Sequence, residues 1–243
     1  MMQAKVISVQ LINFLGYHVL FQDVDVVWYK HPLSNRLFTD PSYKLNEFDL
    51  IFQEDGSHST RYNPYSANSG FYYVRNNERT RYLFTQLLYH GANIIQSGSH
   101  QQILISLLNE YASLYGLSVK ILDGDDFPGG FHFHRRKDFM KKVMKGEFIP
   151  WIFHMSWTKN KSFKLEYMKQ SGYWYVKDQC EDKDVDTIEK FMGEASNFLS
   201  TCCSLEPLIQ CFYSDRPSII PCTDSKHLSE PGFTFSKSKG SFW

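Results

Sequence analysis

The chain has 243 residues, 42% of them hydrophobic and 16% aromatic, which is enough to bury one sizeable core. Lysine plus arginine and aspartate plus glutamate number 26 each, so no overall charge would attract nucleic acid or a membrane surface. The sequence contains no run of 18 apolar residues, and its N-terminus lacks the basic flank and apolar core of a signal peptide. We therefore expect one domain of catalytic size that holds any anionic ligand locally.

The hydrophobic pattern predicts strands that alternate with helices, and therefore a mixed α/β sheet. Residues 2–15 should form a helix that ends at Gly16 and feeds a buried strand over 17–28. Because a helix and a buried strand are half of a βαβ unit, we expect the strand before this helix to be missing from the sequence. Further strands are expected over 49–53, 67–74 and 117–122, a turn at 31–33, a long loop at 54–66, extended pieces at 131–134 and 149–153, and helices over 77–90, 101–111 and 137–145.

Two carboxylates stand one residue apart at the far end of the first predicted strand. Because side chains alternate faces, Asp23 and Asp25 would project the same way if the strand stays regular. Two hard oxygen donors at one point suit Mg²⁺ or Mn²⁺, the ions that also bridge phosphate oxygens. The alternative is a solvated pair where a strand runs out into a loop, but an unpaired carboxylate beside a core strand is costly. The sequence therefore predicts a divalent metal site here.

Polar residues also cluster at three later points, near the ends of predicted strands and helices. They lie in Asn68-Ser69-Gly70, in Ser99-His100-Gln101-Gln102, and in His154 with Lys159 and Lys161 after it. Asn68 offers a donor and acceptors to a hydroxylated ligand, and Gly70 permits close approach of the backbone. Equally, Asn, Ser and Gly favour turns, and His100 and Gln101 would cap the helix that follows them.

The last of these clusters would complete a metal and phosphate site. His154 would add a neutral imidazole to the two carboxylates, which shifts the preference from Mg²⁺ towards Mn²⁺. A hydrogen-bonded core histidine is the alternative. Lys159 and Lys161 would neutralise a diphosphate leaving group as point charges, or lie solvated in a loop.

The cysteines predict a separate C-terminal segment. All five lie in the last third of the chain, in a stretch rich in Ser, Pro and Asp: Cys180, Cys202, Cys203, Cys211 and Cys222. This clustering predicts a disulfide-stapled appendage in an oxidising compartment, with one thiol left over. Adjacent Cys202 and Cys203 should not pair with each other, so each should reach a different partner among the other three. A zinc site is the alternative, but no CxxC pair supports it. We expect a catalytic region over 1–178 and the Cys-rich appendage over 179–243.

In combination, these stretches resemble the nucleotide-diphospho-sugar transferase family, which includes plant rhamnogalacturonan xylosyltransferases and extensin arabinosyltransferases. The resemblance covers residues 6–176 and is carried by LFQDVDVVW, ANSGFYYVR, the Gln-bearing helix start and FHMSW. It implies a GT-A type fold whose N-terminal nucleotide-binding βαβ portion is missing here. It also implies a retaining transfer of sugar from a nucleotide-diphospho-sugar to a hydroxyl of a glycan or glycoprotein. The expected location is the Golgi lumen, as a type II membrane protein held by an anchor that this sequence lacks.

The resemblance assigns the metal and phosphate contacts. Asp25 would be a principal Mn²⁺ ligand, and His154 would be the further ligand that closes the site. Asp23 would touch the ribose or the donor sugar as well as the metal. The diphosphate would be bound by Lys159 and Lys161.

The resemblance also assigns the donor-sugar contacts and the reacting centre. Asn68, Ser69 and His100 would bind the donor sugar, and Gln101 would lie near the exposed face of the reacting carbon. Relatives carry Asp-Gln where this chain has His100-Gln101, and this departure puts the donor identity, or activity itself, in question. Because Gln101 is no strong nucleophile, the acceptor hydroxyl would attack from the face that the diphosphate leaves. A covalent glycosyl-enzyme intermediate is the alternative mechanism.

Two other functions stay open. The DxD pattern after an apolar strand also resembles aspartate-nucleophile phosphatases with a DxDxT pattern, but position 27 here is Val27. The second alternative is an inactive or truncated relative that binds a sugar nucleotide weakly or acts as an interaction protein. Neither alternative involves nucleic acid.

Overall fold

The computed structural model describes residues 2–35, 37–41, 43, 47–144, 146–158, 160–170, 173–181, 183–184, 186–187, 190 and 201–205. Contacts divide the chain into two compact units. The first unit consists of Met1–Arg135 and Ile149–Trp157, and the second of Arg136–Phe148 and Thr158–Trp243. The expected boundary at residue 178 between catalytic region and appendage stays a prediction. Within the described ranges, no helix combines the length and the apolar character that a membrane span requires.

The first unit is built on a four-stranded sheet with the strand order β1-β4-β3-β5. Its strands are β1 (Val19–Gln22), β3 (Leu50–Glu54), β4 (Ala67–Val74) and β5 (Val119–Ile121). β4 pairs antiparallel with β1 and β3, while β3 pairs parallel with β5, so the sheet is mixed. A second, two-stranded antiparallel sheet joins β2 (Val26–Trp28) to β6 (Ile152–His154). The predicted mixed α/β class is confirmed, and the arrangement is consistent with a GT-A-like fold.

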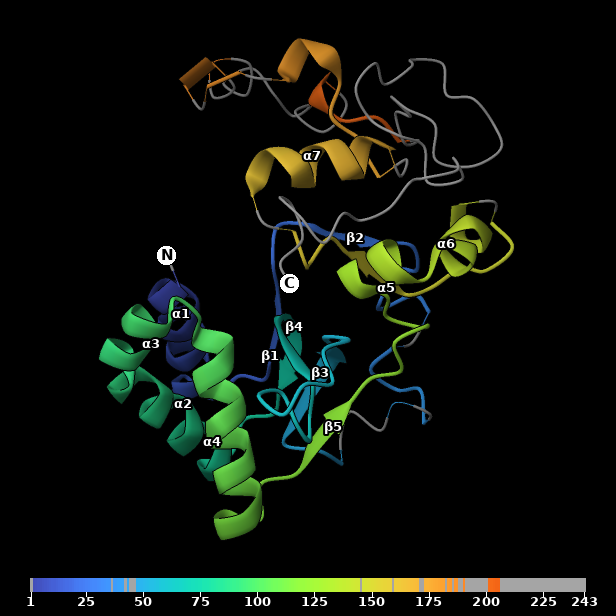
Figure 1. Cartoon of the computed structure of the whole chain (residues 1–243). Coiled ribbons are helices and arrows are strands. Elements are labelled where there is room, and N and C mark those ends of the chain that lie inside the picture. The colour runs from blue at the N-terminus through green and yellow to red at the C-terminus, as the bar shows by residue number, and fades with distance from the viewer. Residues whose placement is uncertain are drawn as a thin grey trace. The chain divides into compact units, whose positions relative to one another are not determined.

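Four helices gather on one side of the four-stranded sheet (Figure 1). They are α1 (Met2–Phe14), α2 (Glu78–Tyr89), α3 (Gly91–Ser97) and α4 (His100–Tyr115). α2 begins with a capping box, in which Asn77 Oδ1 accepts from the Thr80 N–H at 3.0 Å and Thr80 Oγ1 accepts from the Asn77 N–H at 3.2 Å. The first unit also holds α5 (Gly130–Arg135), and the second holds α6 (Lys137–Met144), α7 (Lys161–Gln170) and the 3₁₀ helix η1 (Asp178–Cys180).

The sheet is buried on both faces because successive side chains along its strands pack alternately into two hydrophobic clusters. In β3, Leu50 and Phe52 pack with the helices α1, α2 and α4, while Ile51 joins the opposite cluster. In β4, Tyr72 faces the helices and Phe71 faces away from them. This is the period of two expected for a strand. The central strands therefore form a rigid support from which the polar ends of β1, β3 and β4 project.

The structure departs from the sequence-based expectations at residues 131–134 and 91–97. The extended piece expected at 131–134 is the helix α5, because the Gly129 carbonyl accepts from the N–H groups of His132 at 2.9 Å and Phe133 at 3.3 Å. The Phe-His-Phe-His alternation imitates the period of a strand. α2 ends at Tyr89, close to the expected end at residue 90, and Gly91 then starts α3, a helix that was not expected.

The second unit contains one of the expected disulfides. Cys180 in η1 forms a disulfide with Cys202, with a Cα–Cα distance of 5.4 Å. Cys180 is one of the three cysteines that were predicted as possible partners of Cys202. Among the described cysteines, Cys203 forms no disulfide. Cys211 and Cys222 lie outside the described residues, so the second bridge stays a prediction.

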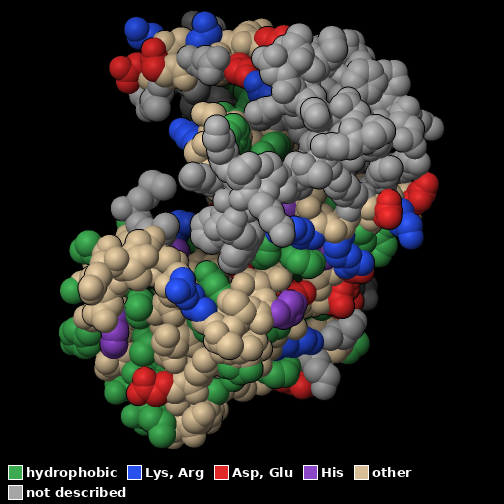
Figure 2. All heavy atoms as spheres, in the orientation of Figure 1, with side chains coloured by type: hydrophobic (Ala, Val, Ile, Leu, Met, Phe, Trp, Pro, Cys, Tyr) green, Lys and Arg blue, Asp and Glu red, His purple; other side chains and the backbone are tan. Residues whose placement is uncertain are grey.

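Charges of both signs are distributed over the surface. On the face drawn in Figure 2, acidic and basic side chains of the described residues lie interspersed among neutral ones. Some of them form ion pairs, such as Arg79 Nε with Asp49 Oδ2 at 2.9 Å. This mixing agrees with the equal numbers of acidic and basic residues, and it gives the described part of this face no extended field of one sign.

Candidate metal and donor-sugar site

The three predicted metal ligands meet at one point. Ligand atoms of Asp23, Asp25 and His154 all lie within 4.8 Å of one another, and His154 Nε2 is 3.5 Å from Asp25 Oδ1. Asp25 and His154 are buried and Asp23 is partly exposed, so the group opens towards solvent on one side. Asp23 and His154 are 131 positions apart in the sequence. They meet because β2 pairs with β6 in the register that sets Val26 opposite His154.

The carboxylates converge for a different reason from the one that the sequence suggests. Residues 17–28 do not form one regular strand; β1 ends at Gln22, the chain turns, and β2 begins at Val26 in the other sheet. The Asp23 N–H donates to the Gly70 carbonyl at 2.7 Å, and the Met155 N–H donates to the Asp25 carbonyl at 3.1 Å. The turn between two sheets therefore aims both carboxylates at one place, and strand alternation has no part in it.

Gly70 makes the room in which this cluster forms. A Cβ built on Gly70 would lie 2.3 Å from His154 Cε1 and 2.9 Å from Asp23 Oδ2. Real Cβ atoms do not approach other heavy atoms so closely, and the backbone at Gly70 is held by β4 and by the Asp23 N–H. A glycine is therefore required where β4 passes under the metal ligands.

Gln53 determines which nitrogen of His154 faces the carboxylates. The Gln53 amide nitrogen donates to the carbonyls of Phe127 at 2.9 Å and Pro128 at 3.1 Å. Its Oε1 must therefore be the acceptor that meets His154 Nδ1 at 2.8 Å, and Nδ1 must carry the proton. His154 Nε2 is then the nitrogen with a lone pair, and it faces Asp25. Gln53 is 0% exposed, so this arrangement is fixed inside the core.

The cluster fits a divalent cation. It offers two carboxylates and an imidazole nitrogen with a lone pair, and the other imidazole nitrogen is hydrogen bonded, as is usual for metal-ligating histidines. A carboxylate-rich set with one imidazole suits Mg²⁺ or Mn²⁺ better than a thiolate-seeking metal. Lys5 of α1 reaches Asp23 Oδ1 as an ion pair and offsets part of the negative charge. Lys5 was not predictable from the sequence, since nothing in α1 indicates that Lys5 would reach the end of β1.

A second residue that was not predicted, Asp55, organises the neighbouring residues that the resemblance assigns to the donor sugar. Its Oδ1 accepts from Asn68 Nδ2 at 2.7 Å and from Gln101 Nε2 at 3.1 Å, and its Oδ2 accepts from Trp157 Nε1 at 3.3 Å. Burial raises the pKa of the Asp55 carboxyl, although these hydrogen bonds act in the opposite direction. Gln101 Oε1 accepts from both the N–H of Ser69 at 2.9 Å and its hydroxyl at 3.0 Å.

Asn68 connects this network to the metal cluster. Its Oδ1 accepts from the Gly70 N–H at 2.7 Å, and the Gly70 carbonyl holds Asp23. One hydrogen-bonded network beside the candidate metal ligands therefore contains Asn68, Ser69 and Gln101. These residues come from two separate stretches of the sequence. The signal that could have found Asp55 is its place directly after β3, at the entrance to the long loop expected over 54–66.

The remaining predicted residues differ in what the structure says of them. His100 starts α4 beside Gln101 and is buried, and burial together with the charge of Lys5 lowers its pKa to about 4. His100 is therefore neutral near pH 7, where an aspartate would be charged. Lys161 is exposed at the start of α7 in the second unit. Lys159 lies outside the described residues, so the contact of both lysines with a diphosphate stays a prediction.

Comparisons with known proteins identify the family of the chain. A family model described as nucleotide-diphospho-sugar transferase matches residues 1–168. A beta-arabinofuranosyltransferase, RAY1, of Arabidopsis thaliana is 28% identical over 177 residues, which cover 66% of this chain and 31% of that protein. A UDP-galactose:fucoside alpha-3-galactosyltransferase of Dictyostelium discoideum is 23% identical over 186 residues, which cover 67% of this chain and 26% of that protein. The chain spans less than a third of the length of either relative. With the family model covering well over half of its residues, this chain belongs to the nucleotide-diphospho-sugar transferase family.

Proposed function

We propose that this chain carries the metal and donor-sugar site of a retaining glycosyltransferase. It would move a sugar from a nucleotide-diphospho-sugar to a hydroxyl of a glycan or glycoprotein, with the help of Mn²⁺. One observation carries the proposal: Asp23, Asp25 and His154 converge directly beside the buried network of Asn68 and Gln101. A cation site next to a set of neutral hydrogen-bonding groups suits a diphosphate joined to a sugar.

The residues of the site would divide the work of transfer. Asp23, Asp25 and His154 would hold Mn²⁺, which would supply positive charge against the negative charge that grows on the departing diphosphate. Lys5 adds a second positive charge from the α1 side, next to Asp23. Gln53 keeps His154 in the tautomer with a lone pair on Nε2. Gly70 keeps the floor of the site free of side-chain atoms.

Retention is what the family resemblance implies, and the side chains near the proposed sugar position favour attack by the acceptor from the leaving-group face over a covalent intermediate. Gln101 is a neutral amide whose oxygen already accepts two hydrogen bonds from Ser69. Asp55 is a carboxylate, but its two oxygens accept from three N–H donors and its pKa is raised. Both side chains are therefore better suited to positioning than to attack. The acceptor hydroxyl would then approach from the face that the diphosphate leaves, and catalysis would rest on positioning and electrostatics.

The relatives indicate the sugars to test first. Their names refer to an arabinofuranosyl and a galactosyl transfer, so a pentose and a hexose donor are both candidates. We propose the Golgi lumen as the compartment, through an anchor outside the given sequence. The Cys180–Cys202 disulfide supports a compartment that permits disulfides.

Metal dependence and donor turnover provide the test. The chain is incubated with UDP-galactose or UDP-arabinofuranose and a fucoside or arabinoside acceptor, after EDTA treatment and after addition of Mn²⁺. Turnover should vanish with EDTA and return with Mn²⁺. Asp25→Asn should abolish it, whereas Glu110→Gln, which removes one exposed carboxylate elsewhere in the first unit, should leave it unchanged. Turnover that persists in EDTA would reject the metal, and an inverted product anomer would reject retention.

A sugar-nucleotide-binding protein without turnover is the second candidate. His100 favours it, because a neutral imidazole stands where the family resemblance leads us to expect an aspartate that accepts hydrogen bonds from donor hydroxyls. Binding and turnover assays distinguish the two functions. Mn²⁺-dependent binding of UDP-sugar with neither transfer nor hydrolysis, together with turnover gained in His100→Asp, would favour the binding protein.

A further inference from the structure

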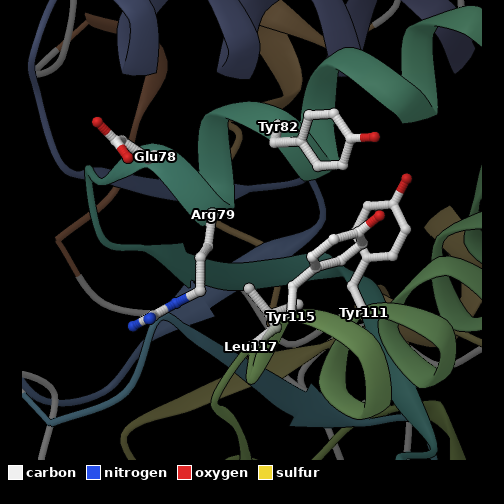
Figure 3. Close-up of a pocket in the computed structure, with 6 residues that line it drawn as sticks. All are labelled: Glu78, Arg79, Tyr82, Tyr111, Tyr115 and Leu117. Carbon is white, nitrogen blue, oxygen red and sulfur yellow. The ribbon is translucent and has the colours of Figure 1, made fainter.

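A second hollow lies in the first unit, away from the metal cluster. It has a volume of about 300 Å³ and is lined by Glu78, Arg79, Tyr82, Tyr111, Tyr115 and Leu117. We call it the tyrosine pocket. Figure 3 shows the three tyrosine rings on one side, Arg79 on the other, and open space between them. Its volume lies at the lower end of the range for small-molecule sites, which suits a ligand of one or two sugar units.

The three rings form a compact aromatic wall. Ring centroids lie 5.5 Å apart for Tyr82 and Tyr111, 5.6 Å for Tyr82 and Tyr115, and 5.2 Å for Tyr111 and Tyr115. Tyr111 is buried, but Tyr82 is 44% and Tyr115 is 51% exposed, so large ring surfaces remain in contact with water. The hydroxyl groups of Tyr82, Tyr111 and Tyr115 lie near one another (Figure 3). The wall thus combines apolar ring surface with a cluster of hydroxyl groups.

The opposite wall is held in place by an ion pair. The Arg79 guanidinium points away from the rings in Figure 3 and binds buried Asp49, with Nε–Oδ2 at 2.9 Å and Nη2–Oδ1 at 3.2 Å. Asp49 also accepts from the Ser118 N–H at 3.0 Å and from Asn77 Nδ2 at 2.7 Å. The stem of Arg79 therefore lines a pocket whose walls are already formed before any ligand binds. Preformed walls lower the entropic cost of binding.

The pocket is distinct from the candidate metal site. α4 carries Gln101 at its N-terminal end and Tyr111 and Tyr115 at its C-terminal end. At 1.5 Å per residue, the helix separates these residues by about 15 to 21 Å. β4 runs the same way, with Asn68 near its start and α2 following its far end at Glu78. A ligand in the tyrosine pocket would therefore not touch the metal ligands.

The lining indicates the chemistry of the ligand. The charge of Arg79 is engaged by Asp49, and Glu78 adds an acidic side chain to the rim, so the pocket does not favour an anion. Burial and the nearby hydroxyl of Tyr82 raise the pKa of Tyr111 to about 12, so the wall stays neutral. A neutral sugar has an apolar C–H face that stacks on an aromatic ring, and hydroxyls at its edge that bond to tyrosine hydroxyls and charged rim groups.

We propose that the tyrosine pocket binds a neutral sugar unit of the acceptor glycan, away from the reacting end. The proposal rests on the proposed function, since it takes the acceptor to be a glycan. The pocket would hold one part of the acceptor while another part reaches the metal site, which lowers KM for long acceptors and leaves transfer to short ones unchanged.

Binding is measured first, without metal or donor. Arabinobiose and galactobiose are titrated into the full chain and followed by saturation-transfer NMR and calorimetry. At least one should bind, and Tyr115→Ala should weaken binding by about tenfold or more because one ring face is lost. Tyr115→Phe keeps the ring and should keep most of the affinity. Tyr89→Ala, which removes a 77% exposed tyrosine of α2 outside the pocket, is the matched control and should bind as the wild type does.

Kinetics separates this proposal from the proposed function. If transfer is observed, Tyr115→Ala should raise KM for an oligosaccharide acceptor and leave kcat and the KM for a monosaccharide acceptor unchanged. If transfer is absent but Tyr115-dependent sugar binding is present, the proposed function fails and the pocket stands. The pocket is rejected if neither disaccharide binds, if Tyr115→Ala binds as well as Tyr89→Ala, or if choline binds and the sugars do not. A thermal melt of Tyr115→Ala establishes that this variant is folded.

Discussion

Replacing Gln53 by methionine should weaken cation binding without removing a cation ligand. The Gln53→Met variant keeps the approximate shape of the side chain but leaves the His154 Nδ1–H and the Phe127 carbonyl without the partner that each has now. A buried polar group that loses its partner costs about 1 to 3 kcal/mol, so two such groups should lower the free energy of unfolding by about 3 kcal/mol. The imidazole would also be free to change tautomer or rotate.

The effect on the metal should be separate and measurable. Loss of the hydrogen bond that orients a metal-ligating histidine costs about 10- to 100-fold in metal affinity. Titration of the Gln53→Met chain with Mn²⁺, followed by electron paramagnetic resonance, should show such a rise in Kd. Nitrogen-15 NMR of the imidazole should show that the His154 proton no longer resides only on Nδ1. Gln53→Glu keeps an acceptor for His154 and should restore most of the affinity.

A matched control separates this effect from general destabilisation. Gln10 is also buried, and its amide donates to the Arg81 carbonyl at 3.1 Å and to Thr85 Oγ1 at 2.6 Å, between α1 and α2. Gln10→Met should lower stability to a similar extent but leave the Mn²⁺ affinity unchanged. If Gln53→Met binds Mn²⁺ as tightly as the wild type, with His154 still protonated on Nδ1, then Gln53 does not position the imidazole.

Three further predictions concern the floor of the site, pH and the disulfide. Gly70→Ala should abolish Mn²⁺ binding in calorimetry while the far-ultraviolet circular dichroism is kept, because its Cβ would meet His154 Cε1 at 2.3 Å. Burial lowers the pKa of His134 to about 4, so the unfolded chain binds this proton more readily and stability falls as the pH drops below about 6.5. Near pH 5 the loss is about 2 kcal/mol, and urea titrations of His134→Gln should lack that part of the pH dependence. Cys202→Ser should lower stability by about 3 kcal/mol through loss of its bridge to Cys180, as measured in chemical denaturation.

Elements with a strong local pattern were predictable from the sequence. β3 and β4 are runs of apolar and aromatic residues, and α2 has both a capping residue, Asn77, and an apolar face, so both the type and the place of these elements follow from neighbours in the chain. The donor types of Asp23 and Asp25 likewise pointed to a cation before any fold was known. What local pattern could not show was the turn that divides residues 17–28 between two sheets, because that turn depends on pairing with β6, more than a hundred residues later.

The missed site residues share one physical cause. Gln53 and Asp55 stand at the end of β3, where polar residues are common as strands run into loops, and Lys5 lies on a helix that carries little amphipathic signal. Each becomes significant only through a partner that is distant in sequence: His154 for Gln53, Gln101 for Asp55, and Asp23 for Lys5. Gly70 is different, because its missing side chain, which permits close approach, is a property that the sequence alone shows.

Because the chain leaves the first unit and later returns to it, cation binding should make local unfolding of β2 and β6 less frequent. The chain leaves the first unit after Arg135 and returns to it for Ile149–Trp157, and this returning segment carries His154 while Asp23 and Asp25 precede it by more than a hundred residues. A cation bound by Asp23, Asp25 and His154 would link residues that lie before and after the segment 136–148 of the second unit. At a concentration about 100 times its Kd, it would stabilise the closed state by about 2.7 kcal/mol. Amide hydrogens of β2 and β6 should then exchange about a hundredfold more slowly with Mn²⁺ than without it, while those of β3 and β4, deep between the two hydrophobic clusters, would change little.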